Sequence, residues 1–401
     1  MSVIHHTFGP FVNTRYLVAS LRSIFSGSQS TEHLRTALQE HFGRSAFLFA
    51  NGRDALWALL RAVELRSGEA IVIQGFTCAV LPNAIHAAGG TPVYADIDRA
   101  TLNLTVDSVR SVLTPRTRAI ICQHTFGIPA DVIGLRKLCD KHQVLLIEDC
   151  AHIIADQKDS LIGKYGDAVL LSFGRDKAIS GVSGGAILVQ DNAQADRLQQ
   201  IEQNAAELPR VQKLRFRLYP FIYWKAKLLW PLRLGKPYLK LMRILRVLPP
   251  VLTAEEKRGN HPPAIHRIPN ASAALALYCL KRLTAINEHR RQLAARYRRA
   301  FPDALADSPA PQKMPLLLRN ADEIVAALKR HEIYLDDGWR GAVVNPPSSD
   351  QERMGYTKGS CPVAERVARE VLSLPTHPTM TEQDADRLIM IIKRVSSTIA
   401  S

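Results

Sequence analysis

The sequence predicts an α/β protein built around a mostly parallel sheet and divided into two domains. Between residues 50 and 191, short apolar runs rich in Val and Ile alternate with helical patterns. Several of these runs are apolar throughout, as expected for strands that helices cover on both faces. The order of strands and helices is that of repeated β-α-β units. Because 401 residues exceed the usual size of one hydrophobic core, a second domain is expected.

Six of the apolar runs are expected to be strands, and helical patterns separate the first four. The expected strands are residues 70–76, 91–98, 118–124, 144–150, 168–173 and 185–191. The helical candidates between them are residues 80–89, 107–113 and 131–142. Upstream, a further helix is expected at residues 53–63, where apolar side chains recur on one helical face.

The chain changes character after residue 205. A cationic segment rich in aromatic residues and proline extends to about residue 260, and a long helical pattern begins near residue 270. A strand, a helix, a Gly/Pro-rich loop and a final helix are then expected at residues 314–319, 322–331, 338–362 and from about 382. We therefore expect a large domain over residues 1–255, which includes the insertion at about 205–260, and a small C-terminal α/β domain over residues 256–401.

Composition excludes several classes of protein. Hydrophobic residues make up 46% of the chain and charged residues 22%, which excludes a disordered or collagen-like chain. The six cysteines form no CxxC pair and no spacing suited to zinc, so neither a disulfide framework nor a metal site is expected. The first residues lack a signal-peptide pattern, and no apolar stretch reaches about 18 residues. These observations favour a cytoplasmic protein.

Side chains with catalytic chemistry follow the expected strands. Asp149 and His152 come at the end of one strand, Ser172 ends the next, and Lys177 lies in the loop after it. Ligands of open α/β sheets bind beyond the carboxyl ends of the strands. An acid, a hydroxyl and an amine would therefore meet at one edge of the sheet.

A short turn upstream adds an anion-binding feature to this group. The turn Asn51-Gly52-Arg53 begins the helix expected at residues 53–63, and the free amides and dipole of a helix start favour a phosphate. Taken one at a time, all these residues also have ordinary structural roles. A carboxylate caps a helix, a hydroxyl caps a turn, a buried histidine satisfies its own hydrogen bonds, and a loop lysine is solvated. Their order and spacing favour a shared site.

Residues 172–185 carry a pattern that is more specific than its members. The chain reads SFGRDK and then SGG, which resembles the S-F-x-x-x-K and G-G signature of the DegT/DnrJ/StrS family of sugar aminotransferases. Further stretches resemble the family in order and approximate spacing: NGRDALWALLRAV, GGTPVYADID, LTPRTRAIICQHTFGIPADV, LLIEDCAH and CPVAERVAREVLSLPTHPTMTEQD. The resemblance covers about residues 10–200 and 268–395. It implies the aspartate-aminotransferase-like fold (fold type I) and the cofactor pyridoxal 5′-phosphate (PLP).

The resemblance also implies roles for the residues at the strand ends. Lys177 would be the catalytic residue that bonds to PLP. Asp149 would pair with the pyridine nitrogen, and His152 would contact the ring near its phenolic oxygen. The chemistry agrees, because a lysine amine can attack an anchored aldehyde and a buried carboxylate keeps the ring nitrogen protonated.

The phosphate and the ring face of PLP involve four further positions. By the same resemblance, Ser172 and the backbone of Gly52 and Arg53 would hold the phosphate. Cys78 aligns with a cofactor-binding position that often carries an aromatic residue stacked on the ring. A thiol there forgoes stacking worth about 0.5–1.5 kcal/mol, unless Phe76 replaces it.

Two other positions depart from the family pattern. Ser183 precedes the Gly-Gly pair, where the family often has an acidic residue. Ile265-His266-Arg267 stands where the family has an Asn that reaches the phosphate of the neighbouring subunit. Arg267 would be the replacement anion donor.

The resemblance implies an aminotransferase that moves an amino group from an amino acid to a nucleotide-linked keto-sugar, in cell-surface polysaccharide or secondary-metabolite biosynthesis. Glutamate is the expected donor, and a homodimer is expected by the same analogy. Two alternatives remain open: a related sugar dehydratase, in which histidine replaces the lysine, and a PLP-binding regulatory or scaffold protein that has lost catalysis. Lys177 argues against the first, and the departures leave the second open.

The net charge of +15 is concentrated in one segment. Residues 210–250 contain six Arg and five Lys but no Asp or Glu, with aromatic residues between them. Three interpretations fit: a peripheral membrane contact, a cationic wall for a nucleotide diphosphate, or a helical insertion packed on its own protein. Nucleic-acid binding is not expected, because no recognisable module accompanies the charge. Any helix here is expected to break at Pro220, Pro231 and Pro237.

Overall fold

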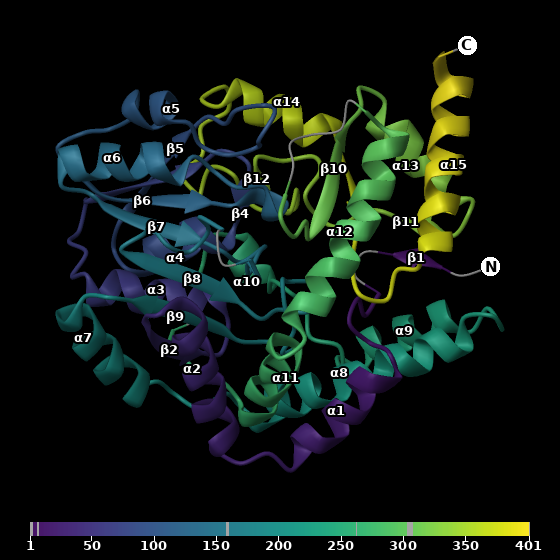
Figure 1. The fold of residues 1–401 in the computed structure, drawn as a ribbon, viewed down its shortest axis with the longest axis horizontal. Coiled ribbons are helices and arrows are strands. Elements are labelled where there is room, and N and C mark those ends of the chain that lie inside the picture. Colours follow the sequence, from purple (N-terminus) through teal and green to yellow (C-terminus); the bar gives the residue numbers. More distant parts are fainter. Residues whose placement is uncertain (1–2, 6–7, 158–159, 262, 303–307, 401) are drawn as a thin grey trace.

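A seven-stranded sheet forms the centre of the structure, in the order β2-β9-β8-β7-β6-β3-β5 (Figure 1). The computed structural model describes residues 3–5, 8–157, 160–261, 263–302 and 308–400. β9 runs antiparallel to both its neighbours, and the other adjacent strands are parallel, which confirms the mostly parallel sheet. The strands are β2 (Ser45–Phe49), β3 (Ala70–Gln74), β5 (Thr91–Ala95), β6 (Thr117–Gln123), β7 (Leu145–Asp149), β8 (Ala168–Ser172) and β9 (Gly185–Val189).

The six strands expected from the sequence are all present, but β2 was missed. It lies upstream of the region where strands and helices alternate, and it pairs with β9 in an antiparallel register. Within the sheet it contacts only that one strand, at an edge. A short apolar run whose single partner is distant in sequence gives no local signal.

Helices cover both faces of the sheet. Successive residues of a strand point to opposite faces, and here both sets are apolar and must be buried. Ile71 and Ile73 of β3 pack in one apolar cluster, whereas Val72 packs in another. The first face is covered by α3 (Gly52–Ala62), α4 (Val80–Ala87) and α7 (Asn192–Gln203). The second is covered by α2 (Gln29–Phe42), α6 (Val132–His142) and α11 (Asn270–Leu280). Burial on both faces explains why the strands are apolar throughout.

The strand ends bring the predicted site residues to one edge. β7 ends at Asp149, and β8 ends at Ser172, which lies opposite Gly185 at the start of β9. The loop between β8 and β9 carries Lys177. α3 begins at Gly52, shortly after the end of β2. The loop and the helix start therefore open at the same edge as Asp149.

A second, smaller unit follows. β10 (Lys313–Leu317) pairs antiparallel with β13 (Val371–Pro375), and β1 (Ile4–His5) pairs with β11 (Ile333–Tyr334). Its helices are α12 (Leu283–Ala300), α13 (Ala321–Lys329) and α15 (Glu382–Ala400), which share one apolar cluster. The long helical pattern from residue 270 is two helices, of which α11 packs on α2 and α12 on α15. The domain boundary at residues 255 and 256 stays a prediction.

Short elements complete the described structure. They are α5 (Val106–Arg110), the 3₁₀ helix η1 (Thr125–Gly127), α10 (Ala254–Lys257), α14 (Pro362–Glu370), and the paired strands β4 (Thr77–Cys78) and β12 (Val344–Asn345). The pairing of β4 with β12 places the loop around residue 345 beside Cys78.

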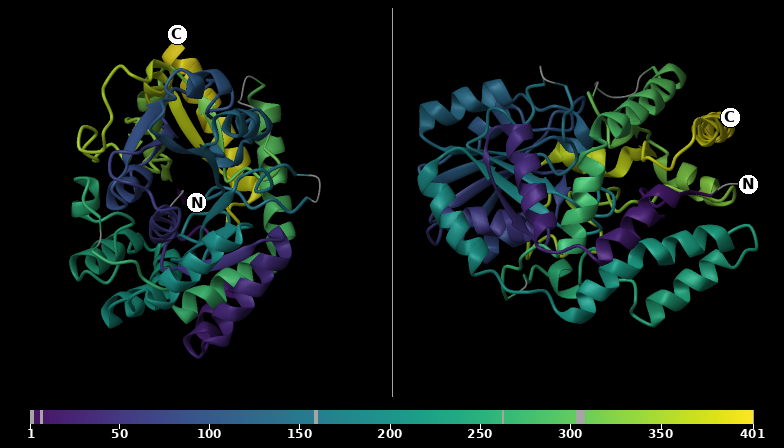
Figure 2. Two further views of the ribbon diagram at one scale, coloured as in Figure 1. Left: turned by 90° about the vertical axis from the view of Figure 1, so that its left-hand side faces the viewer. Right: turned by 60° about the horizontal axis from the view of Figure 1, so that its bottom comes forward.

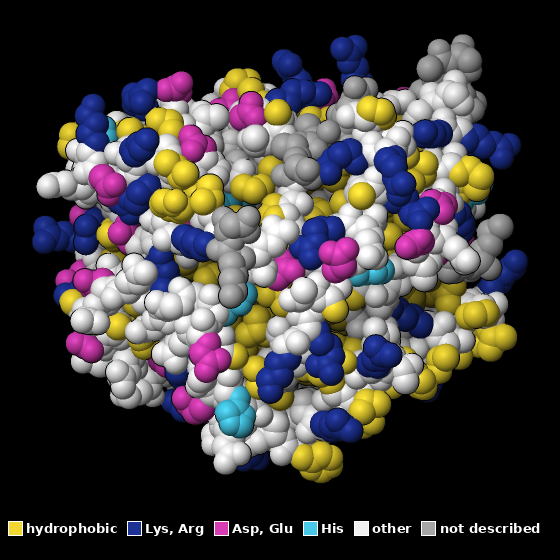
Figure 3. All heavy atoms as spheres, viewed as in Figure 1, with side chains coloured by type: hydrophobic (Ala, Val, Ile, Leu, Met, Phe, Trp, Pro, Cys, Tyr) yellow, Lys and Arg dark blue, Asp and Glu magenta, His cyan; other side chains and the backbone are white. Residues whose placement is uncertain are grey.

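The cationic segment forms two helices, α8 (Arg210–Leu229) and α9 (Gly235–Ile244), which pack on each other and beside α1 (Thr14–Ile24) (Figure 2). The expected break at Pro220 is wrong, because α8 continues through it. The residues around Pro220 are buried, and this packing offsets the hydrogen bond that a proline removes. Pro237 lies in the first turn of α9, where a missing N–H is tolerated. Hydrophobic and basic side chains gather at the lower right of Figure 3, over these helices.

No helix in the described part of the chain has both the length and the apolar content needed to cross a bilayer.

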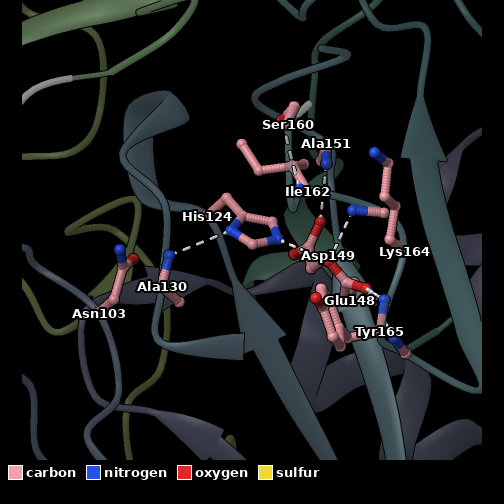
Figure 4. Close-up of polar contacts among 12 residues, drawn as sticks. Asn103, His124, Ala130, Glu148, Asp149, Ala151, Ser160, Ile162, Lys164 and Tyr165 are labelled. Atoms are coloured by element: carbon pink, nitrogen blue, oxygen red, sulfur yellow. Dashed lines mark hydrogen bonds and ion pairs between the residues drawn. The ribbon is translucent and has the colours of Figure 1, made fainter. Parts of the chain in front are cut away.

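Glu148, next to Asp149 on β7, anchors the strand to its surroundings (Figure 4). Its carboxylate is fully buried and accepts hydrogen bonds from the backbone N–H groups of Gly163 (2.7 Å), Tyr165 (2.8 Å) and Gly166 (2.6 Å). His124 lies 3.1 Å away through Nε2. Because Nδ1 of His124 accepts from the Ala130 N–H, Nε2 carries the proton and donates to Glu148.

The hydrogen bonds to Glu148 determine its charge state. Burial alone would raise its pKa, but the bond from His124 and the backbone amides outweigh burial and lower the pKa below its ordinary value. The Cys150 thiol completes a trio whose ligand atoms are near enough for a metal ion. However, existing hydrogen bonds already use both ring nitrogens of His124 and both oxygens of Glu148.

We expect Glu148→Gln to destabilise the protein by about 2–4 kcal/mol at pH 7, because buried N–H donors lose a charged acceptor. The folded pKa of Glu148 is lowered, so its contribution is present above the ordinary value of 4.5 and is lost as the pH falls through the folded pKa. The difference between wild type and variant, measured by denaturant unfolding, should therefore shrink on acidification. Glu40→Gln, at an exposed position of α2, is the control; equal midpoints for all three proteins at pH 7 would contradict the assignment.

Candidate active site

Lys177 lies in a closed loop between β8 and β9. The N–H of Phe173 donates to the Gly184 carbonyl (2.8 Å), and the Gly181 N–H donates to the Phe173 carbonyl (2.9 Å). The Lys177 carbonyl accepts from the guanidinium of Arg290 (3.2 Å), a fully buried residue of α12. Burial lowers the pKa of Arg290 to about 10, so the side chain remains a cation and a donor at neutral pH. The backbone of Lys177 is therefore held by its own loop and by Arg290 of α12.

The amine of Lys177 lies near three other titratable groups. Its charge shifts the pKa values of Cys78, Asp149 and His152. In each case burial is the larger cause of the shift. No hydrogen bond or ion pair joins the amine to another described residue. The structure thus brings together four residues predicted from separate parts of the sequence.

Asp149 is a buried carboxylate with few partners. Its Oδ1 accepts one hydrogen bond, from the Ala151 N–H (2.9 Å). Burial raises its pKa above the ordinary value, and the Ala151 bond and the charge of Lys177 offset this only in part. A carboxylate in this setting favours an added cationic N–H group beside it.

His152 is held as a neutral ring. Its Nδ1 accepts from the Phe126 N–H (3.1 Å), which assigns the proton to Nε2. The ring stacks on Phe126 (centroids 5.8 Å apart, 20° between planes) and meets Trp339 edge-on (5.0 Å). Burial first, and then the charges of Lys177 and Lys313, lower its pKa well below the ordinary value. The proton on Nε2 makes His152 a donor toward an oxygen.

The start of α3 and the end of β8 are in close contact. A Cβ added to Gly52 would lie 3.2 Å from Cβ and 3.3 Å from Oγ of Ser172, so glycine keeps the approach open. A Cβ on Gly185 would lie 2.6 Å from the backbone of Asn51, so glycine is needed there as well. The hydroxyl of Ser172 donates to no described residue. Ser172 and the first turn of α3 thus form one polar corner.

Arg53 lies in the first turn of α3, and a role of its backbone in holding the phosphate stays a prediction. Its guanidinium is paired with Glu256 of α10 and with Asn51 Oδ1 (3.3 Å), and burial lowers its pKa. Asn51 also caps α3 by accepting from the Asp54 N–H (2.9 Å). The side chain of Arg53 therefore joins the cationic insertion to the site.

Two positions that depart from the family pattern, Ser183 and Arg267, form hydrogen bonds with backbone carbonyls. Ser183 is buried and donates to the Ala50 carbonyl (2.5 Å), next to the start of α3. Arg267 donates to the carbonyls of Gln203 and Ala205 (3.0 Å each), within its own chain. Its role as an anion donor stays a prediction.

Phe76 and Cys78, the two residues considered for the position next to the PLP ring, have different surroundings. Phe76 is fully buried against Phe126 (5.9 Å) and Trp339 (5.4 Å), as part of the core. Cys78 lies within range of the charges of Lys177 and Arg53, and burial raises the pKa of its thiol. The thiol therefore stays protonated at neutral pH. Stacking by Phe76 stays a prediction.

Sequence reasoning missed four residues of the site: Phe126, Arg290, Lys313 and Trp339. Lys313 is buried and paired with Asp337 (2.9 Å), and its charge lowers the pKa of His152. Only Trp339 had a local signal, an aromatic residue within the Gly/Pro-rich loop at 338–362. The others reach the site through contacts between distant segments.

These residues fit PLP as a set. The polar corner of Gly52 and Ser172 suits a phosphate, and the partner-poor carboxylate of Asp149 suits a protonated ring nitrogen. His152 offers a donor for a ring oxygen, and the amine of Lys177 is unengaged within the described chain. An anion site, an acid, a donor and an amine are what the groups of that cofactor need.

Comparison with known proteins identifies the family. The model of the DegT/DnrJ/EryC1/StrS aminotransferase family matches residues 13–217 and 240–393. The UDP-N-acetyl-3-dehydro-α-D-glucosamine 3-aminotransferase of Acidithiobacillus ferrooxidans is 27% identical over 356 residues, 86% of this chain and 82% of that protein.

Solved structures share the fold. PseC of Helicobacter pylori, an aminotransferase involved in the biosynthesis of pseudoaminic acid, is 18% identical with a TM-score of 0.74, and 99% of this chain and 100% of that chain are covered. NtdA of Bacillus subtilis, with bound cofactor PMP, is 18% identical with a TM-score of 0.75 and coverage of 99% and 85%. The fold is therefore PLP fold type I. The chain belongs to the DegT/DnrJ/EryC1/StrS aminotransferase family and is a PLP-dependent aminotransferase.

Proposed function

We propose that this aminotransferase moves an amino group from an amino acid, with glutamate as the donor, to a nucleotide-linked keto-sugar. The observation that carries the proposal is the meeting of the Lys177 amine, the Asp149 carboxylate and the His152 ring at one strand edge, next to the polar corner of Ser172. The relative from Acidithiobacillus ferrooxidans is named for amination of a UDP-linked keto-sugar, which supports this substrate class.

Each residue of the site has one expected task. Lys177 holds and moves a proton at Nζ, Asp149 places a negative charge against the ring nitrogen, and His152 donates from Nε2 to an oxygen. Ser172 and the first turn of α3 bind the phosphate. PLP, when bound, supplies an electron sink for the carbon that carries the amino group. Because one site serves donor and acceptor in turn, ping-pong kinetics are expected.

The same proposal covers assembly and location. We expect a homodimer in the cytoplasm, with a peripheral membrane contact through residues 210–250. All six cysteines are free thiols, which suits a reducing compartment. The place in cell-surface polysaccharide or secondary-metabolite biosynthesis follows from the substrate class.

The direct experiment combines the purified protein with PLP, glutamate and a panel of nucleotide-linked keto-sugars, and reads the products by mass spectrometry. An aminated sugar nucleotide and stoichiometric 2-oxoglutarate are expected. A protein that binds PLP but aminates no sugar with any amino donor would favour the regulatory or scaffold alternative.

Lys177→Ala should lower the rate of amino transfer by about 10³-fold or more, because both covalent attachment and proton movement are lost. Lys141→Ala, on the exposed face of α6, is the matched control and should keep the wild-type rate. A Lys177→Ala protein as active as this control would refute the assigned role.

Asp149→Asn should separate stability from activity. The folded pKa of Asp149 is raised, so ionisation in the protein without PLP costs stability as the pH rises through the ordinary value toward the folded one. At pH 7 the Asn variant without PLP should therefore be as stable as wild type or more so. Its transfer rate should fall by about 10²-fold or more, because the negative charge beside the ring nitrogen is lost.

Thermal unfolding with and without PLP checks this prediction. PLP should raise the Tm of wild type by more than that of Asp149→Asn. Asp196→Asn, at an exposed position of α7, controls for loss of charge. Strong destabilisation of Asp149→Asn without PLP, or an equal Tm rise in both proteins, would contradict the role assigned to Asp149.

A further inference from the structure

Exposed apolar side chains are concentrated on α1, α8, α9 and their adjoining loops. Of the fifteen large hydrophobic side chains that are exposed in the described chain, twelve lie within residues 13–25 and 210–251, which we call the basic apolar surface. Phe25 is 89% exposed, and Leu232 and Ile244 are each 67% exposed. The others are Val18, Leu21, Val211, Leu214, Leu228, Leu234, Leu241, Leu245 and Val251. Such a concentration marks an interaction site.

The basic apolar surface carries one sign of charge. Residues 13–25 and 210–251 contain thirteen Lys and Arg and no Asp or Glu. Three of these cations serve the protein itself. Lys227 donates to the carbonyls of Gly9 and Val12 (2.9 Å each). Lys213 pairs with Glu207 and Lys236 pairs with Glu332. Nine exposed cations of this surface form no ion pair with a described residue: Arg15, Arg22, Arg210, Arg217, Lys225, Arg233, Lys240, Arg243 and Arg246.

The inner faces of these helices are already satisfied. Tyr219, Ile222, Tyr223 and Ala226 of α8 and Leu239 of α9 are buried in the core beneath. An insertion packed on its own protein explains those residues but not the outward-facing Leu and Ile. The helices therefore have a second apolar face that no described residue covers.

α1, α8 and α9 lie together at one edge of the molecule, and the right-hand view of Figure 2 shows α8 and α9 lying alongside each other there. The family model does not match residues 218–239, the centre of this insertion. The centre of the surface therefore lies outside the matched part of the chain, whereas residues 13–25, 210–217 and 240–251 lie within it.

Charge distinguishes among the occupants of this surface. A second copy of the chain, related by twofold symmetry, would bring the same thirteen cations against themselves. A nucleic acid would pair with the cations but would leave the exposed Leu and Ile side chains without a partner. An anionic lipid surface satisfies both, because headgroups attract the Lys and Arg while the aliphatic side chains enter the acyl boundary.

We propose that the basic apolar surface docks this enzyme on anionic membranes, with α1, α8 and α9 lying in the headgroup region. This inference extends the membrane contact of the proposed function, adds α1 to it, and is independent of the sugar chemistry. No covalent step is involved, and binding is reversible and sensitive to salt.

The test is flotation of the PLP-loaded protein with phosphatidylcholine vesicles that contain either no anionic lipid or about 30 mol % phosphatidylglycerol, at about 0.1 M salt. Wild type should float with the anionic vesicles only. The triple variant Arg217→Ser, Lys240→Ser, Arg243→Ser should partition about 100-fold more weakly, since each cation near the surface contributes about fivefold. The triple variant Leu232→Ser, Leu241→Ser, Ile244→Ser should lose about 10-fold or more.

Matched controls remove the same groups elsewhere. Arg116→Ser, Lys137→Ser, Lys141→Ser removes three exposed cations, and Ile133→Ser, Leu161→Ser removes exposed apolar side chains; both proteins should float like wild type. Amino transfer measured without vesicles should be unchanged in all variants, which separates this inference from the proposed function.

Three outcomes would overturn the proposal. One is a wild-type protein that does not float with anionic vesicles. Another is flotation that neither surface variant reduces relative to its control. The third is a Leu/Ile variant that changes the oligomeric state by sedimentation, without vesicles, while its flotation equals that of wild type; that result would assign the surface to a second copy of the chain.

Discussion

The site depends on a difference between two adjacent carboxylates on β7, which accept different numbers of hydrogen bonds and have opposite pKa shifts. Glu148 accepts three backbone N–H bonds and one from His124, and its pKa is lowered. Asp149 accepts one, from Ala151, and its pKa is raised. The first carboxylate holds the strand in place. The second is left in need of a positive partner, and the charge that lowers its pKa most is that of Lys177.

The sequence predicted the part of this arrangement that is local. Asp149 and Ser172 end apolar runs, so their meeting at one sheet edge follows from the parallel order of β7 and β8, and Lys177 follows from the pattern around it. Phe126 and Arg290 could not be predicted, because they act through a backbone N–H and a long-range bond to a carbonyl. β2 and the continuity of α8 through Pro220 were missed because packing with distant segments determines them.

The residues that depart from the family pattern, and the helical insertion, form contacts close to the site. Ser183 supports the turn before α3, and Cys78 places a protonated thiol beside Lys177. The insertion is joined to the loop of Lys177 by Arg175, which lies over the ring of Tyr219 (4.8 Å) and donates to the Pro249 carbonyl (2.8 Å). Arg53 and Glu256 form a second link. The enzyme core and the added helices are thus mechanically connected.

We propose that the Lys177 amine is the group that bonds to PLP. Borohydride reduction of the PLP-loaded protein, followed by proteolysis and peptide mass spectrometry, tests it most directly. We expect one stoichiometric pyridoxyl label, on the peptide that contains Lys177. A label on another lysine, with Lys177 unmodified, would contradict it.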